Sequence, residues 1–389
     1  MSSTLHSSLR WLAVVSIAGC AVAGCTADDA EPTGPTPLTL ALPLGLPQPL
    51  IPADNPLTVE GVELGRHLFY DQRLSGNGQQ ACASCHFQDK GFADGKPVSE
   101  GSTGESTPRN SMGLTNVAYN TTLTWANPVL KTLEQQIKVP MFGEFPIELG
   151  ITGNEETVLQ RFRDDAYTAA LFAAAFPADP DPIDFDNVVK ALASFVRTIV
   201  SGDTPYDRYV YGGDSAALSP SAKKGLDLFF GEKAECFHCH GGFNLSGAAT
   251  HTGVTLNEAS FFNNGLYNVD GMGSYPAGNT GLFEFTKKAD DMGRFRVPTL
   301  RNVTETAPYM HDGSLATLED VVRFYEAGGR HIESGENAGD GRANPYKSQF
   351  VPGFTLTDGE RADLLAFLES LTDPSLATNP AFTKPAPAN

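Results

Sequence analysis

Cysteine is scarce in this chain of 389 residues, and its placement excludes a disulfide framework. Of six cysteines, Cys20 and Cys25 lie in an apolar N-terminal stretch, and the other four fall in two short motifs. None is left over for a structural disulfide, so stability must come from packing and from whatever the two motifs bind.

Basic charge is also in short supply, with 27 Lys and Arg against 46 Asp and Glu and a formal net charge of −19. Such an acidic surface disfavours nucleic acid and anionic lipid as partners. It is compatible with a basic electron donor or protein substrate. No strand-rich segment stands out, and 39 Gly and 27 Pro indicate many loops. The length allows two or three domains, and we expect a mostly α fold.

The N-terminus lacks a hydrophobic run long enough to span a bilayer. Arg10 precedes an apolar stretch from Trp11 to Ala23, and Asp28 follows soon after, which is the pattern of a secretory signal. Val22-Ala-Gly-Cys25 resembles a bacterial lipobox, so we expect residues 1–24 to be removed and Cys25 to carry the lipid. Cys20, in Ile17-Ala-Gly-Cys20, is the second candidate, and a plain secretory signal remains open. The predicted location is the periplasm or cell envelope, with a lipid anchor to the membrane.

Two motifs of the form C-x-x-C-H dominate what is present: Cys82-Ala-Ser-Cys85-His86 and Cys236-Phe-His-Cys239-His240. This is the attachment pattern of a c-type haem: the two thiols join the porphyrin vinyl groups and the histidine ligates the iron. The alternative is a zinc site built from the four thiolates. It leaves His86 and His240 unexplained and fits poorly with an exported protein.

The surroundings of the two motifs repeat, which predicts two cytochrome c-like haem lobes packed around an inter-haem interface. Helices are expected over Thr58–Phe69 and Ser219–Phe230, before the motifs, and over Asn187–Val200 and Thr357–Leu371, at the ends of the lobes. The predicted divisions are a tether and lead-in over 25–56, an N-terminal domain over 57–212, a C-terminal domain over 213–375 and a tail over 376–389. The residues after Asp373 are expected to be disordered.

Three further stretches carry a family resemblance: Arg109-Asn110 with Asn116, Asn120 and Trp125; Gly293–Asn302; and Thr306–Gly313. With the two haem motifs, they resemble the bacterial di-haem cytochrome c peroxidase and MauG family over nearly the whole mature chain. Within that family, the sequence is most similar to MauG and to the methanobactin-associated MbnH branch.

The resemblance implies an unusual ligand for the second haem. The position where ordinary family peroxidases carry a methionine holds Tyr325, on a helix expected over Leu318–Ala327. A phenolate is a hard anion that stabilises Fe(III) and, by the same logic, Fe(IV). A plain core tyrosine is the alternative, since Tyr325 continues an apolar helix face, and the fallback ligands are Met310 and Met292.

The first haem is implied to be the reactive one. The resemblance places distal Gln136, Pro140 and Glu148 over its iron, and a carboxyl group there can move the peroxide proton to the leaving oxygen. Glu144 is the rival, because the distance from Trp125 to Glu148 is a few residues longer than the usual pattern. The loop between Phe87 and Asn110 contains no histidine. We therefore expect a five-coordinate first haem that needs no reductive activation.

The resemblance also implies roles for residues between the haems. Trp125 would share oxidising equivalents between two irons, with a core tryptophan as the alternative. A calcium ion would be held by Asn110, Thr306 and Pro308, since hard oxygen ligands suit Ca²⁺. The candidates for contacts with haem propionates are Arg294, Arg296 and Arg301. His311 is expected to make a structural or a propionate contact, and His238 is expected to be exposed.

Together these features imply a peroxidase in which hydrogen peroxide binds the His86 haem and both haems reach the Fe(IV) level. The oxidised pair would then act on a partner protein at long range, converting tryptophan to kynurenine in an MbnP-like copper-binding partner. One alternative is peroxide scavenging with a small cytochrome or copper protein as donor. The non-enzymatic alternative is a two-haem electron carrier, which would need both irons fully ligated.

Overall fold

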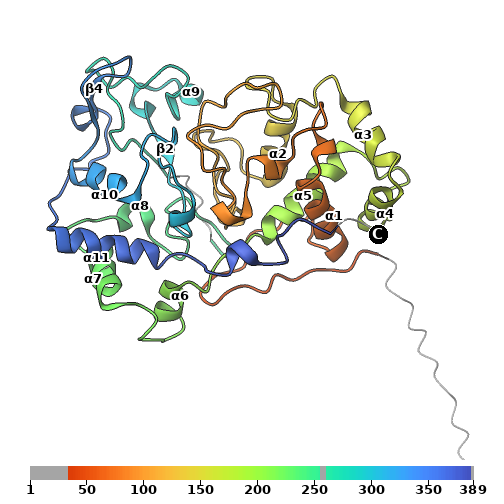
Figure 1. Ribbon diagram of the computed structural model, residues 1–389, viewed down its shortest axis with the longest axis horizontal. Helices are drawn as coiled ribbons and strands as arrows, with labels where there is room; N and C mark the ends of the chain where they lie inside the picture. Colours follow the sequence, from red (N-terminus) through yellow and green to blue (C-terminus); the bar gives the residue numbers. More distant parts are fainter. Residues whose placement is uncertain (1–33, 255–259, 387–389) are drawn as a thin grey trace, which may run out of the picture. The chain divides into compact units, whose positions relative to one another are not determined.

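A computed structural model describes residues 34–254 and 260–386, which belong to one compact unit (Figure 1). The predicted signal peptide, with Cys20 and Cys25, lies outside the described residues. Among the residues described, no helix is both long and apolar enough to cross a bilayer.

The expected mostly α architecture is confirmed within the described ranges. The sheet structure there consists of two short antiparallel ladders, β1 (Phe261–Phe262) with β2 (Phe295–Arg296) and β3 (His331–Ile332) with β4 (Gly339–Asp340). The helices are α1 Val59–Phe69, α2 Leu133–Phe142, α3 Glu155–Arg163, α4 Ala166–Ala175, α5 Phe185–Thr198, α6 Pro205–Val210, α7 Pro220–Phe230, α8 Phe237–His240, α9 Phe283–Thr286, α10 Leu318–Glu326 and α11 Asp358–Glu369.

Hydroxyl caps fix where the expected helices begin. The side chains of Thr58, Ser219, Thr317 and Thr357 accept hydrogen bonds from backbone amides in the first turns of α1, α7, α10 and α11. Each cap satisfies an amide that has no partner inside its helix. All five helices expected from the sequence are present, with ends within two residues of the prediction.

The same helix pair occurs twice. Helix α1 packs on α5, and α7 packs on α11, and each crossing needs a glycine. A Cβ atom on Gly65 would lie 1.9 Å from the Ala191 carbonyl oxygen, and one on Gly225 would lie 2.0 Å from that of Asp363. Only glycine lets the two helix backbones approach this closely. The two halves of the chain therefore share the same helix packing as well as the same motif.

Each helix pair has its own apolar core. Phe69 and Phe195 pack in the first core, with ring centroids 5.2 Å apart, and Phe229 and Phe367 pack in the second, 5.0 Å apart. Helix α6 belongs with the second core, since the Tyr206 ring lies 5.8 Å from that of Phe367. Helix α6 therefore packs in the second core although it precedes residue 212, and the domain division there stays a prediction.

Two buried asparagines, one from each half of the chain, donate hydrogen bonds to Ser201 in the segment between α5 and α6. Asn116 and Asn302 both have left-handed backbones, with φ of 60° and 58°. Asn116 donates its side-chain amide to the Ser201 carbonyl over 3.0 Å, and Asn302 donates to Ser201 Oγ over 2.8 Å. The equivalent turns of the two lobes are thereby fixed to one point of the chain.

The expectation of disorder after Asp373 is wrong for residues 374–386. Leu376 and Phe382 are buried in the core formed by α1 and α5. Tyr70 donates to the Phe382 carbonyl over 2.6 Å, and Gln88 donates to that of Leu376 over 2.8 Å. This segment crosses from the C-terminal lobe back to the N-terminal lobe, and sequence periodicity could not reveal a contact across about 300 residues.

The lead-in over residues 34–56 is extended, as expected, and touches both lobes. Tyr119 donates to the Pro47 carbonyl over 2.8 Å, and the Thr252 amide donates to that of Gln48 over 2.9 Å. Residues 34–56 therefore bond to residues that lie before and after Ser201 in the chain.

Candidate haem centres

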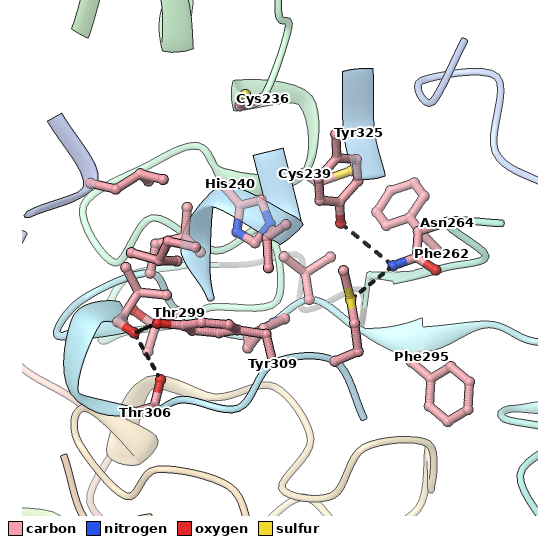
Figure 2. A pocket seen from close by; sticks show the side chains of 18 of the residues that line it. Cys236, Cys239, His240, Phe262, Asn264, Phe295, Thr299, Thr306, Tyr309 and Tyr325 are labelled. Atoms are coloured by element: carbon pink, nitrogen blue, oxygen red, sulfur yellow. Dashed lines mark hydrogen bonds between the residues drawn. The ribbon is translucent and has the colours of Figure 1, made fainter. Parts of the chain in front are cut away.

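The second motif forms one wall of a large cavity. Cys236, Cys239 and His240, on and beside the short helix α8, line this cavity together with apolar side chains from α10 and α11 (Figure 2). His240 Nδ1 donates to the Leu245 carbonyl over 3.2 Å, and burial lowers the pKa of His240 to about 4. The imidazole is therefore neutral, with its Nε2 lone pair left for a metal ion.

Tyr325, in the last turn of α10, faces the same cavity. Burial raises the pKa of its phenol to about 12, and the nearby Cys239 and Cys236 act in the same direction. The Asn264 side-chain amide donates to Tyr325 Oη over 3.5 Å (Figure 2). Deprotonation of so deeply placed a phenol needs a cation, and a ferric iron would supply it.

The two fallback ligands differ in position. Met310 lines the cavity, and its Sδ lies 3.5 Å from the same Asn264 nitrogen. Met292 does not line the cavity and packs against an aromatic cluster formed around Tyr267, Tyr275, Phe295 and Phe324. Of the three candidate ligands, Tyr325 and Met310 therefore line the cavity that contains the second motif.

The three arginines expected at propionates have different environments. Arg301 forms a buried ion pair with Asp207, with distances of 2.7 and 2.8 Å, so its charge is already balanced. Arg294 is 40% exposed, pairs with Asp291 and is not part of the cavity wall, so its contact with a propionate stays a prediction. Arg301 lines the cavity, but with its guanidinium committed to Asp207 it is a poor propionate ligand.

Arg296 is the arginine that fits an anion. It lines the cavity, is buried, and donates to the Thr124 and Val297 carbonyls rather than to a carboxylate. Burial lowers the pKa of its guanidinium to about 10. A buried cation without a counter-charge is costly, and a haem propionate would supply that charge.

His311 provides a second unsatisfied group at this wall. Its ring stacks on Phe295, with centroids 3.6 Å apart and 12° between planes, and burial lowers its pKa to about 4. Its Nε2 atom is buried without a hydrogen-bond partner. A polar group left in this state is expected to meet a ligand atom, so His311 and Arg296 both fit a porphyrin carboxylate.

Trp125 joins the two lobes at the cavity. Its indole Nε1 donates to the Asn110 carbonyl over 2.9 Å, and its own carbonyl accepts from the Arg296 amide over 2.7 Å. The side chain lines the cavity and packs in the same aromatic cluster as Tyr325. Its indole is therefore held rigidly beside the residues that would carry the second haem.

The first motif has the same histidine geometry. His86 Nδ1 donates to the Phe92 carbonyl over 2.6 Å, which leaves Nε2 for a metal, and burial lowers the pKa of the ring. Phe92 is fully buried in the first core with a left-handed φ of 60°. Cys82 and Cys85, which precede His86 in the motif, form no disulfide, and neither do Cys236 and Cys239.

Of the distal candidates, Gln136 and Pro140 lie on one helix, and Glu148 lies near the first motif. Gln136 and Pro140 are four residues apart on α2 and share one helix face, and the Leu149 amide donates to the Pro140 carbonyl over 2.9 Å. This bond holds the neighbouring Glu148 against the helix. Burial raises the pKa of the Cys82 and Cys85 thiols, and the nearby Glu148 carboxylate acts in the same direction.

Glu148 and Glu144 are in different environments. Burial raises the pKa of Glu148, whereas Glu144 is exposed to solvent. Gln136 Oε1 is buried without a hydrogen-bond partner, as expected for an atom that faces a ligand site. Of the two carboxylates, Glu148 is the one that the fold brings to the first motif.

The predicted calcium ligands also gather at the cavity, whose wall includes Asn110, Thr306 and Pro308. Asn110 donates its side-chain nitrogen to the Lys96 carbonyl over 2.7 Å, which leaves Oδ1 for a cation. In the described ranges, no group of three or more His, Cys, Asp or Glu side chains could hold a metal. A calcium ion here would therefore depend on amide and carbonyl oxygens.

Sequence reasoning missed Asn264, which contacts both Tyr325 and Met310. It lies in a loop after β1, with no periodic pattern or motif to mark it. His238 is exposed, as expected, and stacks on Phe350 with centroids 4.5 Å apart.

Comparisons with known proteins agree with this geometry. Residues 59–215 match the family model for di-haem cytochrome c peroxidase. The chain is 36% identical to the cytochrome-c peroxidase IdrP1 of Denitromonas iodatirespirans, over 95% of both chains. It is 34% identical to the methylamine utilization protein MauG of Methylorubrum extorquens, over 85% of this chain and 83% of the relative.

A solved structure, described as a MauG-like protein associated with microbial copper homeostasis, superposes with a TM-score of 0.87. It is 50% identical in sequence, and the match covers 90% of this chain and 99% of the other. Relatives of this kind are oxidoreductases of the peroxidase type, and the family carries two covalently bound haem c groups, for which both C-x-x-C-H sites here are suited. The chain belongs to the di-haem cytochrome c peroxidase and MauG family.

Proposed function

We propose that this enzyme uses hydrogen peroxide to oxidise a side chain of a partner protein at long range, as a MauG-type oxidase. The observation that carries the proposal is the placement of Tyr325 in the cavity of the second motif, beside Cys239 and across from His240. A phenolate ligand stabilises high oxidation states of the iron. A thioether ligand stabilises Fe(II) and suits a haem that passes electrons on to a peroxide-scavenging site.

The first haem, when bound through Cys82, Cys85 and His86, would supply the reaction with peroxide. The neutral His86 imidazole, oriented by the Phe92 carbonyl, is ready to ligate iron through Nε2. Glu148 would take the proton from the nearer peroxide oxygen and return it to the leaving oxygen. Its raised pKa, caused by burial, suits a group that must both accept and donate near neutral pH. Gln136 and Pro140 would shape the space in which peroxide binds.

Trp125 would carry oxidising equivalents between the two centres. The indole is fixed at both ends, by its Nε1–H bond to Asn110 and by the bond from the Arg296 amide to its backbone. A rigid indole needs little rearrangement when it loses an electron. One hydrogen peroxide would supply two oxidising equivalents, which the two haems, when bound, would hold between them. A calcium ion at Asn110, Thr306 and Pro308 would keep Asn110, and thereby Trp125, in place.

The partner class follows from the similarity to the copper-homeostasis protein, which is 50% identical over most of both chains. We infer an MbnP-like copper-binding protein as substrate, with conversion of tryptophan to kynurenine as the product. Such a reaction belongs in the periplasm or cell envelope, where a lipid on Cys25 would hold the enzyme at the membrane.

The test combines spectroscopy with product analysis. Low-temperature EPR of the diferric protein should show one high-spin haem and one low-spin haem without thioether ligation. Peroxide should then give a long-lived near-infrared charge-resonance band, and mass spectrometry should detect kynurenine in a co-incubated copper-binding partner. Two low-spin haems in the resting protein would contradict the proposal and favour a simple electron carrier.

A scavenging cytochrome c peroxidase is the second candidate, because Met310 also faces the cavity and the IdrP1 relative has that name. Fast steady-state turnover of peroxide with a reduced small cytochrome or copper protein would favour this alternative. Slow turnover, together with a persistent oxidised state, would favour the long-range oxidase.

A further inference from the structure

A tyrosine outside the haem cavity has a carboxylate as its hydrogen-bond partner. Tyr267 donates its hydroxyl to Asp312 Oδ2 over 2.5 Å. The other carboxylate oxygen, Oδ1, accepts from the Ser314 amide over 3.0 Å, which fixes the orientation of the group. Tyr267 itself is only 7% exposed. The Tyr267 phenol and the Asp312 carboxylate that accepts its hydrogen bond are therefore held in a fixed orientation inside the protein.

This pairing is distinctive in the described part of the chain. Tyr70, Tyr119 and Tyr309 donate to backbone carbonyls, and Tyr275 donates to the Asn263 side-chain carbonyl over 2.8 Å. Across residues 34–254 and 260–386, the Tyr267 hydroxyl is the one whose bond ends on a carboxylate. An amide oxygen cannot keep a proton, whereas a carboxylate can, so Tyr267 alone of these tyrosines has a base positioned to take its proton.

A continuous row of rings links Tyr267 to the haem cavity. Phe295 and His311 stack in the cavity wall, 3.6 Å apart, and the Tyr275 ring lies 6.2 Å from Phe295 and 6.4 Å from His311. The Tyr267 ring is a further 5.6 Å from Tyr275. Phe295, Tyr275 and Tyr267 belong to the aromatic cluster that also contains Trp125 and Tyr325. The packed rings therefore form a continuous path through which an electron can tunnel from Tyr267 to the haem site, and this path needs no ring between them to be oxidised.

The charges around Tyr267 favour loss of a proton together with an electron. Burial raises the pKa of Tyr267, so the phenol is protonated at neutral pH and has a proton to give. The Arg330 guanidinium lies 5.9 Å from the centre of the ring. A nearby cation disfavours a positively charged oxidised ring, whereas transfer of the proton to Asp312 leaves the oxidised ring neutral.

We propose that Tyr267 is a redox-active residue that gives one electron to the peroxide-oxidised haem pair while its proton moves to Asp312. The phenolic O–H bond breaks, an O–H bond forms on Asp312 Oδ2, Tyr267 becomes a neutral phenoxyl radical, and the haem pair is reduced by one electron. This inference rests on the proposed function for its oxidant. The Tyr267 radical would hold one oxidising equivalent away from the haems, in the aromatic cluster next to α10.

The first experiment treats the diferric holoprotein with hydrogen peroxide and follows it by freeze-quench EPR and optical decay. The natural protein should give a phenoxyl radical as the high-valent state decays, more slowly in D₂O than in H₂O. Tyr267→Phe should lose this radical, slow the decay several-fold and lose the solvent isotope effect. Asp312→Asn should resemble Tyr267→Phe, and Asp312→Glu should restore the radical. The matched control is Tyr275→Phe, which removes a hydroxyl bonded to an amide and should still form the radical.

The second experiment supplies a different oxidant, so that failure of the proposed function can be distinguished from failure of this inference. Flash-quench oxidation of the same holoproteins with a dissolved ruthenium photo-oxidant should form the phenoxyl radical in the natural protein and not in Tyr267→Phe. If peroxide gives no high-valent state but photo-oxidation gives this radical, only the proposed function fails. Equal radical yield and decay in Tyr267→Phe and the natural protein would overturn the inference, as would an unchanged isotope effect in Asp312→Asn.

Discussion

The side-chain amide of Asn264 lies between two rival iron ligands, 3.5 Å from Tyr325 Oη and 3.5 Å from Met310 Sδ. Both ligand atoms therefore face the same part of the cavity, and the amide can steady either of them. A second haem bound by the Tyr325 phenolate would have a potential suited to storing oxidising equivalents, whereas one bound by the Met310 thioether would have a potential suited to electron transfer.

Replacement of Tyr325 tests that choice directly. Tyr325→Phe should convert the second haem to thioether ligation by Met310 and raise its reduction potential, because a soft ligand favours Fe(II). EPR and redox titration measure both effects. Tyr309→Phe is the matched control, since Tyr309 also lines the cavity but donates to the Val303 carbonyl over 3.0 Å. An unchanged low-spin signal in Tyr325→Phe would mean that Tyr325 is not the ligand, and Tyr325→Phe combined with Met310→Leu should leave the haem without a sixth side-chain ligand.

Trp125 is the group expected to couple the two haems. Trp125→Phe keeps a ring in the aromatic cluster but loses both the indole redox chemistry and the bond to the Asn110 carbonyl. The near-infrared band formed with peroxide should disappear, while haem content and the resting spectrum remain. Stopped-flow spectroscopy in the near infrared makes the measurement. Persistence of the band in this variant would exclude the indole as the relay.

Glu148 should control the rate of the reaction with peroxide. Glu148→Gln should slow it by roughly 10²–10⁴-fold, the usual contribution of a positioned proton-transfer group. Glu144→Gln, at an exposed site, should leave the rate unchanged. Burial raises the pKa of Glu148, and the deprotonated form accepts the proton. The rate should therefore fall as pH drops, with a midpoint above the ordinary glutamate value of about 4.3, and Glu148→Gln should lose this dependence. Equal rates for both variants would remove Glu148 from the mechanism.

Arg296 should set the potential of the second haem through its buried positive charge. Arg296→Leu should lower the potential on the order of 60 mV or more, because a cation beside the haem stabilises the more reduced state. Spectroelectrochemical titration measures the shift. Arg294→Leu is the control, since that side chain is 40% exposed, pairs with Asp291 and should have little effect. A larger shift for Arg294→Leu than for Arg296→Leu would reverse the assignment made from burial.

Arg301 has a structural role in contrast to Arg296. Its guanidinium and the Asp207 carboxylate are both fully buried and joined by two hydrogen bonds, of 2.7 and 2.8 Å. Arg301→Leu leaves the buried Asp207 carboxylate without a counter-charge and should lower the free energy of unfolding by about 3–5 kcal/mol. Denaturant unfolding measures this loss, and Arg301→Leu combined with Asp207→Leu should recover part of it. A large change in haem potential with little loss of stability would instead indicate a propionate contact.

The sequence could predict features that depend on neighbouring residues. The helices that begin at Thr58, Ser219 and Thr357 follow from a hydroxyl cap ahead of an apolar periodic stretch, and the haem motifs follow from spacing alone. The close crossings at Gly65 and Gly225 were not evident, because their need for glycine comes from a carbonyl more than 100 residues away.

The sequence by itself determined that two c-type haem sites exist, that each follows a capped helix, and that no cysteine remains for a disulfide. Only the tertiary structure decided which charges are balanced: Arg301 has Asp207, Arg296 has no carboxylate, and Glu148 is partly buried where Glu144 is exposed. The physical reason is that burial and pairing are set by segments distant in the chain, whereas motif spacing and helix caps are local. The packing of Phe382 against the first lobe is of the same kind, since a contact across the whole chain leaves no periodic trace in the sequence.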